Sequence, residues 1–507
     1  MEPTLWCLCL ALTLSLLYLL ATTRGKHSRN SRLPPGPTPL PLFGSLFELG
    51  RDPHRSLARL AKTHGPVMSL RLGLVTTVVV SSPDAAREAL QKKDPDLASR
   101  CVPDAIQVPG HYEASLIWNP HNQLWKNLRA IIKSHLFTTR RLDATQSLRR
   151  QKVQQLVGYV RCHAGQAVDI GQAAFATSLN VITSTFFSVD LVDLDSDRAG
   201  DFMDIVSAIM EEVGRPNLSD FFPLLRVIDP QGLRRRVTAH LGKLYKLFDQ
   251  MIDSRLEGVM TDRKTNNTRH DFLDELVHLH IQEDDTRLDR QTIKTLLVDM
   301  FLAGSDTSSN TVQWAMAELL RNPSSMAKAQ AELAKGIGYQ REVEESDIAG
   351  LPFLQAVVKE TLRLHPPVPL LLPHKAETNV ELGGYAVPKG TRVLVNAWAI
   401  GHDGDVWEDP ESFKPERFLE SDVDFRGGDF ELIPFGSGRR LCPGMPLAFR
   451  TVHLMLGSLL QSFDWKLPEG MQPSDVDITE KFGVTLALAA PLRAVAVPTE
   501  YARTSDK

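Results

Sequence analysis

The stretch PFGSGRRLCPG, residues 434–444, decides how the rest of this chain is interpreted. Its Phe435, Gly438, Arg440, Cys442 and Gly444 fit the pattern F-x-x-G-x-R-x-C-x-G. Five fixed positions at this spacing occur by chance roughly once in several thousand chains of such a length, so the pattern is far more specific than a lone glycine motif. The competing interpretation is a buried structural thiol, the commonest fate of a single cysteine.

Through this motif the chain resembles the cytochromes P450, in which the cysteine supplies the thiolate that binds haem iron. The resemblance implies haem b as the cofactor, with Cys442 as its axial ligand. Glycines in such a loop let the backbone turn sharply and come close to the porphyrin. Backbone N–H groups aimed at the sulfur moderate its charge. A thiolate ligand pushes electron density onto iron and favours cleavage of the O–O bond.

Composition excludes several other classes of protein. The chain has 507 residues and a formal net charge of −4, whereas a nucleic-acid-binding surface needs a strong basic excess. At about 150 residues per domain the length alone suggests three domains, but the motifs below span Trp125 to Cys442 and predict one large unit. Five cysteines exclude a disulfide scaffold. Two of them lie near the N-terminus, and Cys101 and Cys162 have no assigned role.

The N-terminus departs from globular composition. Residues 5–22 carry no charge, and this is just long enough to cross a bilayer as a helix. The positive-inside rule places the side that follows in the cytoplasm, because four basic residues come next: Arg24, Lys26, Arg29 and Arg32. A cleaved signal peptide is the alternative, but it would begin with a positive region, and the only charge before the apolar run is Glu2. We expect a transmembrane anchor at 5–22, a basic and proline-rich hinge at 23–45 and a cytochrome P450 catalytic domain at 46–507.

Behind the hinge the sequence predicts a mainly α fold with small β-sheets. Residues 67–80 are rich in β-formers and interrupted at Gly73, which indicates a hairpin. A helix start is indicated by an N-cap at Ser82, a proline in the first turn at Pro83 and an acidic residue beside it at Asp84. These residues predict a helix through Leu90. Together with the resemblance, this gives a cytochrome P450 fold preceded by one N-terminal transmembrane helix.

A second match to the family lies in the helix LPFLQAVVKETLRLHPP and the later FKPERF. Glu360 and Arg363 stand at i and i+3, close enough for an ion pair, although such pairs decorate most surface helices. Arg417 matches the third member of the family's buried Glu-Arg-Arg set. Two guanidinium groups can satisfy the lone pairs of one buried carboxylate, so we expect these three residues to be structural and necessary for stable haem incorporation.

Residues 295–320 resemble the long helix that crosses the distal face of the haem. Gly304 costs about 1 kcal/mol of helix stability relative to alanine, so its place within an apolar helix needs a reason. With Ala303 it would leave room for dioxygen and substrate. The Thr307 hydroxyl can bond to a carbonyl one turn earlier and open a polar notch. Asp306 and Thr307 then form a route for the protons that oxygen activation consumes. A kinked core helix with a capped threonine is the alternative interpretation.

Four residues match the family's contacts to the haem propionates. Trp125 and Arg129 lie at i and i+4 on one helical face, and a guanidinium is suited to holding a carboxylate at two points. Arg440, two residues before the candidate ligand, is the third. His374 is the fourth, although a lone histidine at a strand edge is often an ordinary surface residue.

By family position, the substrate pocket takes in residues 101–118, 296–307, 368–372 and 482–486. Besides Ala303 and Gly304, its candidate residues are aliphatic: Val368, Leu370, Leu371, Leu372, Val484 and Leu486. Such a pocket would hold a hydrocarbon by burial of apolar area, at about 25 cal/mol per Å², and orient it by shape.

Within the family, AGSDTSSNTVQWAM, GRPNLSDFFPLLRVIDPQG and FGVTLALAAPLRAV resemble the plant branch typified by geraniol 8-hydroxylase and ferruginol synthase. The resemblance implies a monooxygenase that hydroxylates a lipophilic terpenoid, a diterpenoid ahead of a monoterpenoid, with O2 and NADPH-derived electrons. A monoterpenoid, alkaloid or xenobiotic hydroxylase is the alternative of the same fold. A reductase-independent P450 that rearranges hydroperoxides, or a haem-binding sensor without catalysis, is the alternative of another class; Asp306 and Thr307 count against the former.

The chain shows no flavin or nicotinamide fingerprint, so electrons must come from a partner. The resemblance implies NADPH–cytochrome P450 reductase, and a proline-hinged anchor is typical of the single-pass endoplasmic-reticulum class whose catalytic domain faces the cytosol. Basic residues are candidate contacts for the reductase on the cysteine-loop side, although most such charges are merely solvated: Lys126, Lys133, Arg140 and Arg141. We expect no nucleic-acid partner and see no sign of an obligate oligomer.

Overall fold

The computed structural model describes residues 12–13, 33–194, 198–261, 271–281, 288–338 and 341–499. Apart from Leu12 and Thr13, the anchor expected at 5–22 lies outside these residues, as does the hinge before Leu33. Among the helices that the structure describes, none has the length and apolar character needed to span a bilayer.

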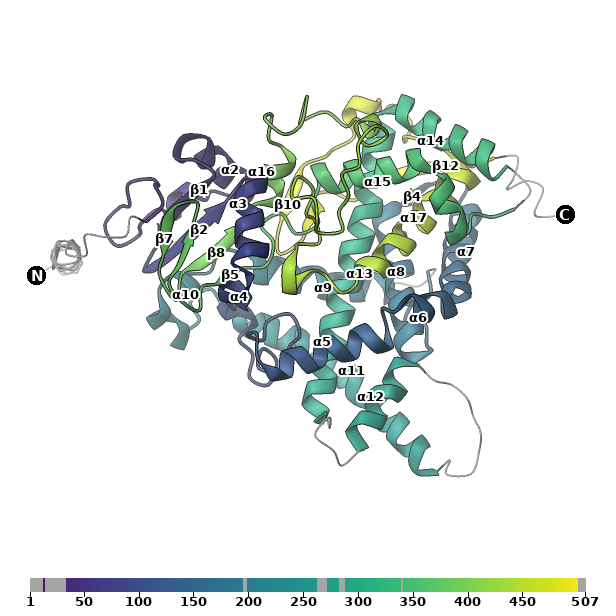
Figure 1. The fold of residues 1–507 in the computed structure, drawn as a ribbon. Coiled ribbons are helices and arrows are strands. Elements are labelled where there is room, and N and C mark those ends of the chain that lie inside the picture. The colour runs from purple at the N-terminus through teal and green to yellow at the C-terminus, as the bar shows by residue number, and fades with distance from the viewer. Residues whose placement is uncertain are drawn as a thin grey trace, which may run out of the picture.

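The fold is mainly helical with small sheets, as the sequence predicted, and the strands of the largest sheet gather on the side of the molecule marked N (Figure 1). The largest sheet has the order β1-β2-β8-β5-β3. Its hairpin, β1 (Val67–Leu72) and β2 (Val75–Val80), turns at Gly73, as predicted. Parallel to β2 runs β8 (Arg392–Val395), which pairs with β5 (His374–Lys375), and β5 pairs with β3 (Ser99–Arg100). Segments almost 300 residues apart thus form one sheet.

The helical body is built around α13 (Arg290–Arg321), which packs most extensively on α8 (Ile170–Phe187). Both helices start with an aspartate cap: Asp289 Oδ1 accepts from the Thr292 N–H at 2.6 Å, and Asp169 Oδ1 from the Gln172 N–H at 3.0 Å. Most residues of α13 are buried, because helices surround it on several sides. Its neighbours include α9 (Arg198–Gly214), α11 (Leu233–Thr261), α15 (Pro352–Leu364) and α17 (Met445–Ser462).

The remaining elements are shorter or lie nearer the surface. The helices are α2 (Pro53–His64), α3 (Pro83–Arg87), α4 (Asp94–Leu97), α5 (Gln123–His135), α6 (Thr139–Ala144), α7 (Gln146–Cys162), α10 (Leu218–Phe221), α12 (Phe272–Ile281), α14 (Pro323–Gly336) and α16 (Ala397–Gly401). The strands are β4 (Ala167–Asp169), β6 (Val380–Leu382), β7 (Tyr385–Val387), β9 (Phe463–Lys466), β10 (Glu480–Phe482), β11 (Leu486–Leu488) and β12 (Arg493–Pro498). The cap predicted at Ser82 is present, and helical structure continues from α3 to Lys92.

Part of the predicted proline-rich hinge packs on the sheet. The Ser69 side chain and backbone donate hydrogen bonds to the carbonyls of Pro34 and Pro35, at 2.6 and 2.8 Å. A Cβ on Gly36 would lie 1.8 Å from the Ser69 carbonyl oxygen, so only glycine fits this crossing. In the structure, the catalytic body therefore includes residues from Pro34 onward.

Candidate active site

The cysteine loop runs between the sheet and the start of α17. The Cys442 N–H donates to the Phe435 carbonyl at 3.0 Å and closes the loop. Gly438 has φ +66°, and a Cβ there would lie 2.1 Å from the Leu90 carbonyl oxygen, which explains the glycine of the motif. Burial raises the pKa of the Cys442 thiol, while the N–H groups of Gly444 and Met445 and the Arg129 charge favour the thiolate and lower it.

Between this loop and α13 lies a cavity whose empty space, counted with the part open to solvent, is about 1510 Å³. Such concave, largely apolar spaces are where proteins hold cofactors and small-molecule substrates. Cys442 lies in one wall, and Ala303, Gly304 and Thr307 of α13 lie in another. We call this space the haem cavity, because the resemblance implies a haem bound at Cys442.

The candidate substrate residues divide among three places. Val368, Leu371 and Leu372 line the haem cavity. Leu370 and Val484 instead line a second cavity beside it, which Leu371 and Leu372 also border. Leu486 is fully buried and lines neither; its carbonyl accepts from the Trp314 indole at 3.0 Å and its N–H donates to Pro367. The structure therefore brings only part of the predicted set to one site.

Cationic side chains cluster in the wall of the haem cavity. Arg440 donates to the carbonyls of Ala98 and Asn119 at 2.7 and 2.6 Å, and its guanidinium lies 4.4 Å from the centre of the Trp125 ring. Arg129 donates to the Leu441 carbonyl beside the candidate ligand. Burial lowers the pKa of both arginines, that of Arg440 to about 10, because each guanidinium is partly removed from water.

Arg100, at the end of β3, is a member of this cluster that sequence reasoning missed. It lines the haem cavity and donates to the Leu372 carbonyl at 2.7 Å and to His374 Nε2 at 3.0 Å. Since His374 Nδ1 must donate to the Leu97 carbonyl at 2.7 Å, Nε2 is the acceptor and the ring is neutral. Burial also holds the pKa of His374 well below its usual value. In this structure His374 thus supports Arg100 and has no N–H left to offer a propionate.

The cluster fits the carboxylates of a haem. No Asp or Glu oxygen of the described residues lies within 4 Å of the Arg100, Arg129 or Arg440 guanidinium nitrogens, and the buried Arg100 Nε has no hydrogen-bond partner. Buried positive groups without anionic partners are costly, so the site calls for negative charge from elsewhere. A planar group bound through Cys442 that carries two carboxylates would supply it, and Arg100, Arg129 and Arg440 would hold them.

The predicted ion cluster forms behind this site. Glu360 and Arg363 are fully buried and make a two-point pair, with Arg363 Nε and Nη2 donating at 2.7 and 2.9 Å. Arg417 Nε and the Lys414 N–H also donate to Glu360 Oε1, at 3.0 and 2.8 Å. Further hydrogen bonds from Arg363 reach the carbonyls of Gly401 and Pro410, so the cluster ties α15 to the segment that leads to the cysteine loop.

On α13, neighbouring polar residues face different spaces. The Thr307 hydroxyl donates to the Ala303 carbonyl at 2.8 Å, as predicted, and faces the haem cavity. Asp306 faces a third, polar cavity of about 960 Å³, and its Oδ2 accepts no hydrogen bond. Burial raises the pKa of Asp306, against the effect of the Thr485 and Asn310 side chains. A Cβ on Gly304 would lie 2.7 Å from Cδ1 of Ile182 on α8, so a larger residue here would have to displace the end of that side chain.

A family model, described as Cytochrome P450, matches residues 34–491. The chain belongs to the cytochrome P450 family. It is 54% identical to geraniol 8-hydroxylase of Catharanthus roseus over 469 residues, which are 92% of this chain and 94% of the relative. Geraniol 8-hydroxylase of Swertia mussotii is also 54% identical, over 93% of this chain and 95% of its own length. Geranylhydroquinone 3''-hydroxylase of Arnebia euchroma is 47% identical over the same shares.

Membership confirms the enzyme class and the cofactor. This P450 is a monooxygenase, an oxidoreductase that uses a haem with a thiolate-bound iron, O2 and NADPH-derived electrons. Those electrons come from a redox partner, and the substrate is hydrophobic. The likeness to geraniol 8-hydroxylase, inferred above from short motifs, extends over more than nine tenths of the chain.

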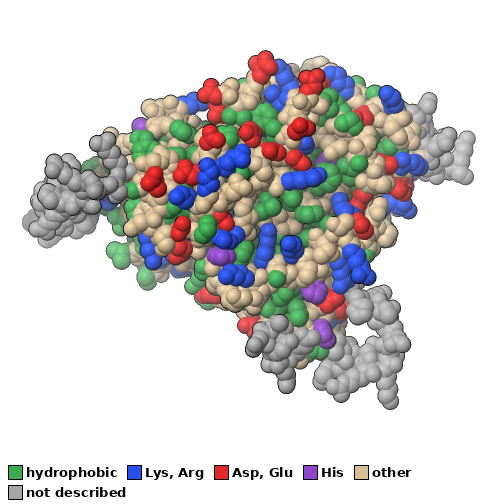
Figure 2. Space-filling view, viewed as in Figure 1, with side chains coloured by type: hydrophobic (Ala, Val, Ile, Leu, Met, Phe, Trp, Pro, Cys, Tyr) green, Lys and Arg blue, Asp and Glu red, His purple; other side chains and the backbone are tan. Residues whose placement is uncertain are grey.

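The candidate docking residues lie at the surface near α5. Lys126, Lys133 and Arg140 are exposed, while Arg141 is partly covered and pairs with Glu275 at 3.0 Å. Figure 2 shows lysine and arginine side chains on the face of the molecule where α5 lies. Exposed cations without a partner remain available to an acidic protein surface, so Arg141 is the weakest of the four candidates.

Proposed function

We propose that this P450 hydroxylates a terpenoid alcohol of about ten carbons at a carbon remote from its hydroxyl group. The observation that carries the proposal is the haem cavity, which aliphatic side chains line together with the candidate ligand Cys442. Its similarity to two geraniol 8-hydroxylases supports the size of the substrate.

The relatives favour a monoterpenoid over the diterpenoid that we expected from the motifs. Two carry geraniol in their names and a third carries geranylhydroquinone, which also contains a ten-carbon chain. None of these three names refers to a diterpenoid, and an aliphatic cavity alone does not set chain length. We therefore take the ten-carbon chain as the proposed substrate.

The bound haem, held at Cys442, would supply the oxidising chemistry that inserts one atom of O2 into a C–H bond. The chain's own residues orient the substrate and move protons. Val368, Leu371 and Leu372 hold the hydrocarbon by burying apolar area, about 25 cal/mol per Å². The shape of these walls, rather than hydrogen bonds, presents the reacting carbon.

Protons reach the haem cavity through α13 in this proposal. The Asp306 carboxyl, which borders the polar cavity and whose buried Oδ2 has no hydrogen-bond partner, takes a proton from water there, and burial helps it retain the proton. Thr307 is the next residue of α13, and its hydroxyl faces the haem cavity. The pair can thus pass protons between two spaces that the helix separates.

We test the proposal with membranes that contain this protein and its reductase. Geraniol, farnesol and geranylgeraniol are each incubated with NADPH, and products are identified by mass spectrometry. Geraniol should give one main hydroxylated product at the highest kcat/KM. Faster and cleaner oxidation of geranylgeraniol would overturn the chain length and restore the diterpenoid.

The two alternatives of another class give different results in the same assay. A hydroperoxide-rearranging P450 would turn over without reductase or NADPH. A sensor would show a substrate-induced change in the haem spectrum and no product. The buried carboxyl of Asp306 at the wall of a polar cavity favours the monooxygenase, because neither alternative needs a proton route.

We also propose that residues 5–22 anchor the protein in the endoplasmic-reticulum membrane, with the catalytic body in the cytosol next to NADPH–cytochrome P450 reductase. The uncharged run and the basic residues behind it support this. Full-length protein should stay with membranes in alkaline carbonate and be digested by protease added to sealed microsomes. Release by carbonate would argue against the anchor.

A further inference from the structure

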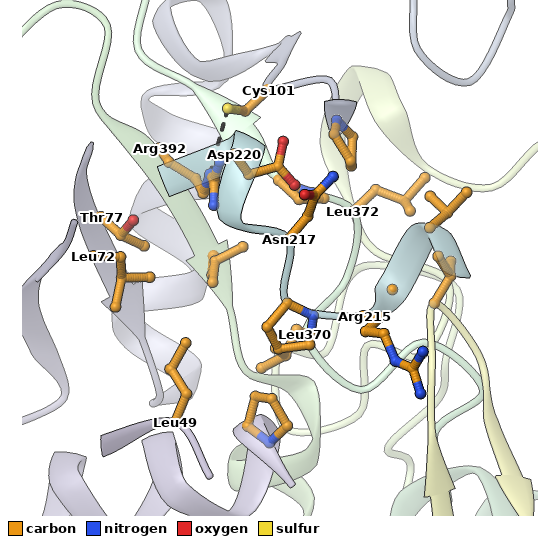
Figure 3. A pocket seen from close by; sticks show the side chains of 18 of the residues that line it. Leu49, Leu72, Thr77, Cys101, Arg215, Asn217, Asp220, Leu370, Leu372 and Arg392 are labelled. Carbon is orange, nitrogen blue, oxygen red and sulfur yellow. Dashed lines mark hydrogen bonds between the residues drawn. The ribbon is translucent and has the colours of Figure 1, made fainter. Parts of the chain in front are cut away.

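A second cavity of about 930 Å³ lies beside the haem cavity, and most of its wall is apolar (Figure 3). It is bounded by the large sheet, by residues 213–221, which run from the end of α9 through α10, and by the turn at 482–484. Leucines line much of it, among them Leu49, Leu72, Leu370 and Leu394. Leu371 and Leu372 belong to the walls of both cavities, so the two cavities adjoin at this short segment.

One end of the second cavity is polar. Arg392 of β8 projects into it, and the one hydrogen bond its guanidinium makes with the described residues goes from Nε to Cys101 Sγ, at 3.4 Å. No carboxylate of the described chain lies within ion-pair distance of it. A guanidinium has five N–H donors, so most of its capacity is unused.

Two further polar groups stand at the same end. Asp220 is buried and one of its oxygens, Oδ1, accepts from the Asp104 N–H at 2.7 Å, which leaves Oδ2 for another donor. Thr77 is fully buried, and its hydroxyl has no hydrogen-bond partner. Buried polar groups normally have partners, so a hydroxyl without one, beside a guanidinium and a carboxylate with unused hydrogen-bonding capacity, indicates a missing ligand group. A hydroxyl would suit them, because it accepts from Arg392 and donates to Asp220.

The segment between the cavities is strained. Leu371 has φ +47°, a left-handed conformation that is costly for a leucine and that needs support from its surroundings. Support comes from the Leu371 N–H, which donates to the Val368 carbonyl at 3.1 Å, and from Arg100, which holds the Leu372 carbonyl. Leu371 also reaches the cysteine loop, since its Cδ1 would lie 3.9 Å from a Cβ on Gly436. The segment thus joins the second cavity to the haem site.

We propose that the second cavity binds the hydroxyl end of the substrate at Arg392 and Asp220, while the hydrocarbon chain passes Leu371 and Leu372 into the haem cavity. The proposal rests on the proposed function, because it assumes a terpenoid alcohol. It explains how a site with aliphatic walls selects a carbon far from the hydroxyl: the polar end is held away from the cysteine loop, so the opposite end of the chain faces the candidate ligand.

The test compares geraniol with 2,6-dimethylocta-2,6-diene, which has the same carbon skeleton without the hydroxyl. Binding is read from the substrate-induced change in the haem spectrum of the full-length holoenzyme. Arg392→Gln should weaken geraniol binding about tenfold or more, the range for a lost hydrogen bond to a charged group. The affinity for the hydrocarbon should change less than about twofold. Arg392→Lys should restore part of the loss. In the presence of reductase, the Arg392→Gln variant should also oxidise geraniol at several carbons instead of giving one main product.

Arg215→Gln is the matched control, because this arginine lines the same cavity but is exposed and has Glu211 as a neighbour at 3.7 Å. It removes the same charge and should leave geraniol binding within about twofold. If Arg392→Gln weakens the binding of geraniol and of the hydrocarbon equally, Arg392 only supports the wall of the second cavity and the inference is overturned. Unchanged geraniol binding in Arg392→Gln overturns it as well.

Alkylation of Cys101 by N-ethylmaleimide gives a reading that does not depend on turnover. Its sulfur lies beside Arg392 at the polar end, and the exposed Cys162 serves as the internal reference. Geraniol should slow alkylation of Cys101 but not of Cys162, and the hydrocarbon should slow it much less. If farnesol protects Cys101 and geraniol does not, the proposed chain length fails and the inference stands. If neither alcohol protects it, the inference fails whatever the substrate.

Discussion

Replacing Glu360 by glutamine should destabilise the protein far more than its small chemical change suggests. Glu360 Oε1 accepts three hydrogen bonds, from Arg363, Arg417 and the Lys414 N–H, and Oε2 accepts one from Arg363 Nε. A glutamine oxygen can keep the first three, but its NH2 group then faces Arg363 Nε, donor against donor. The two guanidinium groups also lose their only carboxylate within the cluster.

The expected cost is about 3–5 kcal/mol, the range for removing one partner of a buried ion pair, because all three side chains are largely shielded from water. Glu416→Gln is the matched control. It breaks a pair with Lys328 at 2.6 Å in which both side chains are about half exposed, and such pairs contribute about 0–1 kcal/mol.

The assay is loss of the reduced carbon-monoxide band of the thiolate-ligated haem with increasing urea, measured on full-length protein in membranes. Glu360→Gln should lose the band at a much lower urea concentration than wild type, and Glu416→Gln at nearly the same one. If the two variants have equal midpoints, the cluster does not stabilise the haem site and the reasoning is wrong.

Three other predictions follow from the site. Cys442→Ala should abolish the reduced carbon-monoxide band of thiolate-bound haem; survival of that band would remove the ligand assignment. Thr307→Ala should bind haem normally but consume NADPH with less product and more peroxide, whereas unchanged coupling would remove the proton route through its hydroxyl. Burial lowers the pKa of His402 to about 3 from an unfolded value near 6.5, so the unfolded chain binds a proton that the folded one does not, and stability should fall as the pH drops from 7 to 5. His402→Gln should lessen the shift in urea midpoint over that range, and an undiminished shift would exclude His402 as a source.

Some parts of the site could be predicted from sequence because spacing fixes them. The cysteine loop, the Glu360 set and the α13 residues each place several chemical groups at defined intervals. The structure brings the first two sets together, and of the α13 set it brings Ala303, Gly304 and Thr307 to the haem cavity while Asp306 borders another. Arg100 could not be found in this way. It stands alone in ASRCVP, and it joins the cationic cluster only because β3 pairs with β5 beside His374.

The arrangement of the candidate substrate residues could not be predicted from the sequence either. Leu370, Leu371 and Leu372 are adjacent and chemically alike, so the sequence predicted one pocket for all three. At the left-handed turn of Leu371 the three part: Leu370 lines only the second cavity, whereas Leu371 and Leu372 border both, and a conformation that leucine rarely adopts leaves no signal in its sequence. His374 is similar, since its tautomer follows from two partners far away in the chain.

The order in which the residues of the haem site are synthesised has a consequence for the assembly of the protein with its haem. Arg100 and Arg129 are made roughly 300 residues before Cys442, which at about 5–20 residues per second is a delay of about 15–60 seconds. During that interval the early arginines have neither the cofactor nor the sulfur. Stable capture of haem must therefore wait until synthesis is nearly complete, and a shortage of haem would act on finished chains rather than on nascent ones.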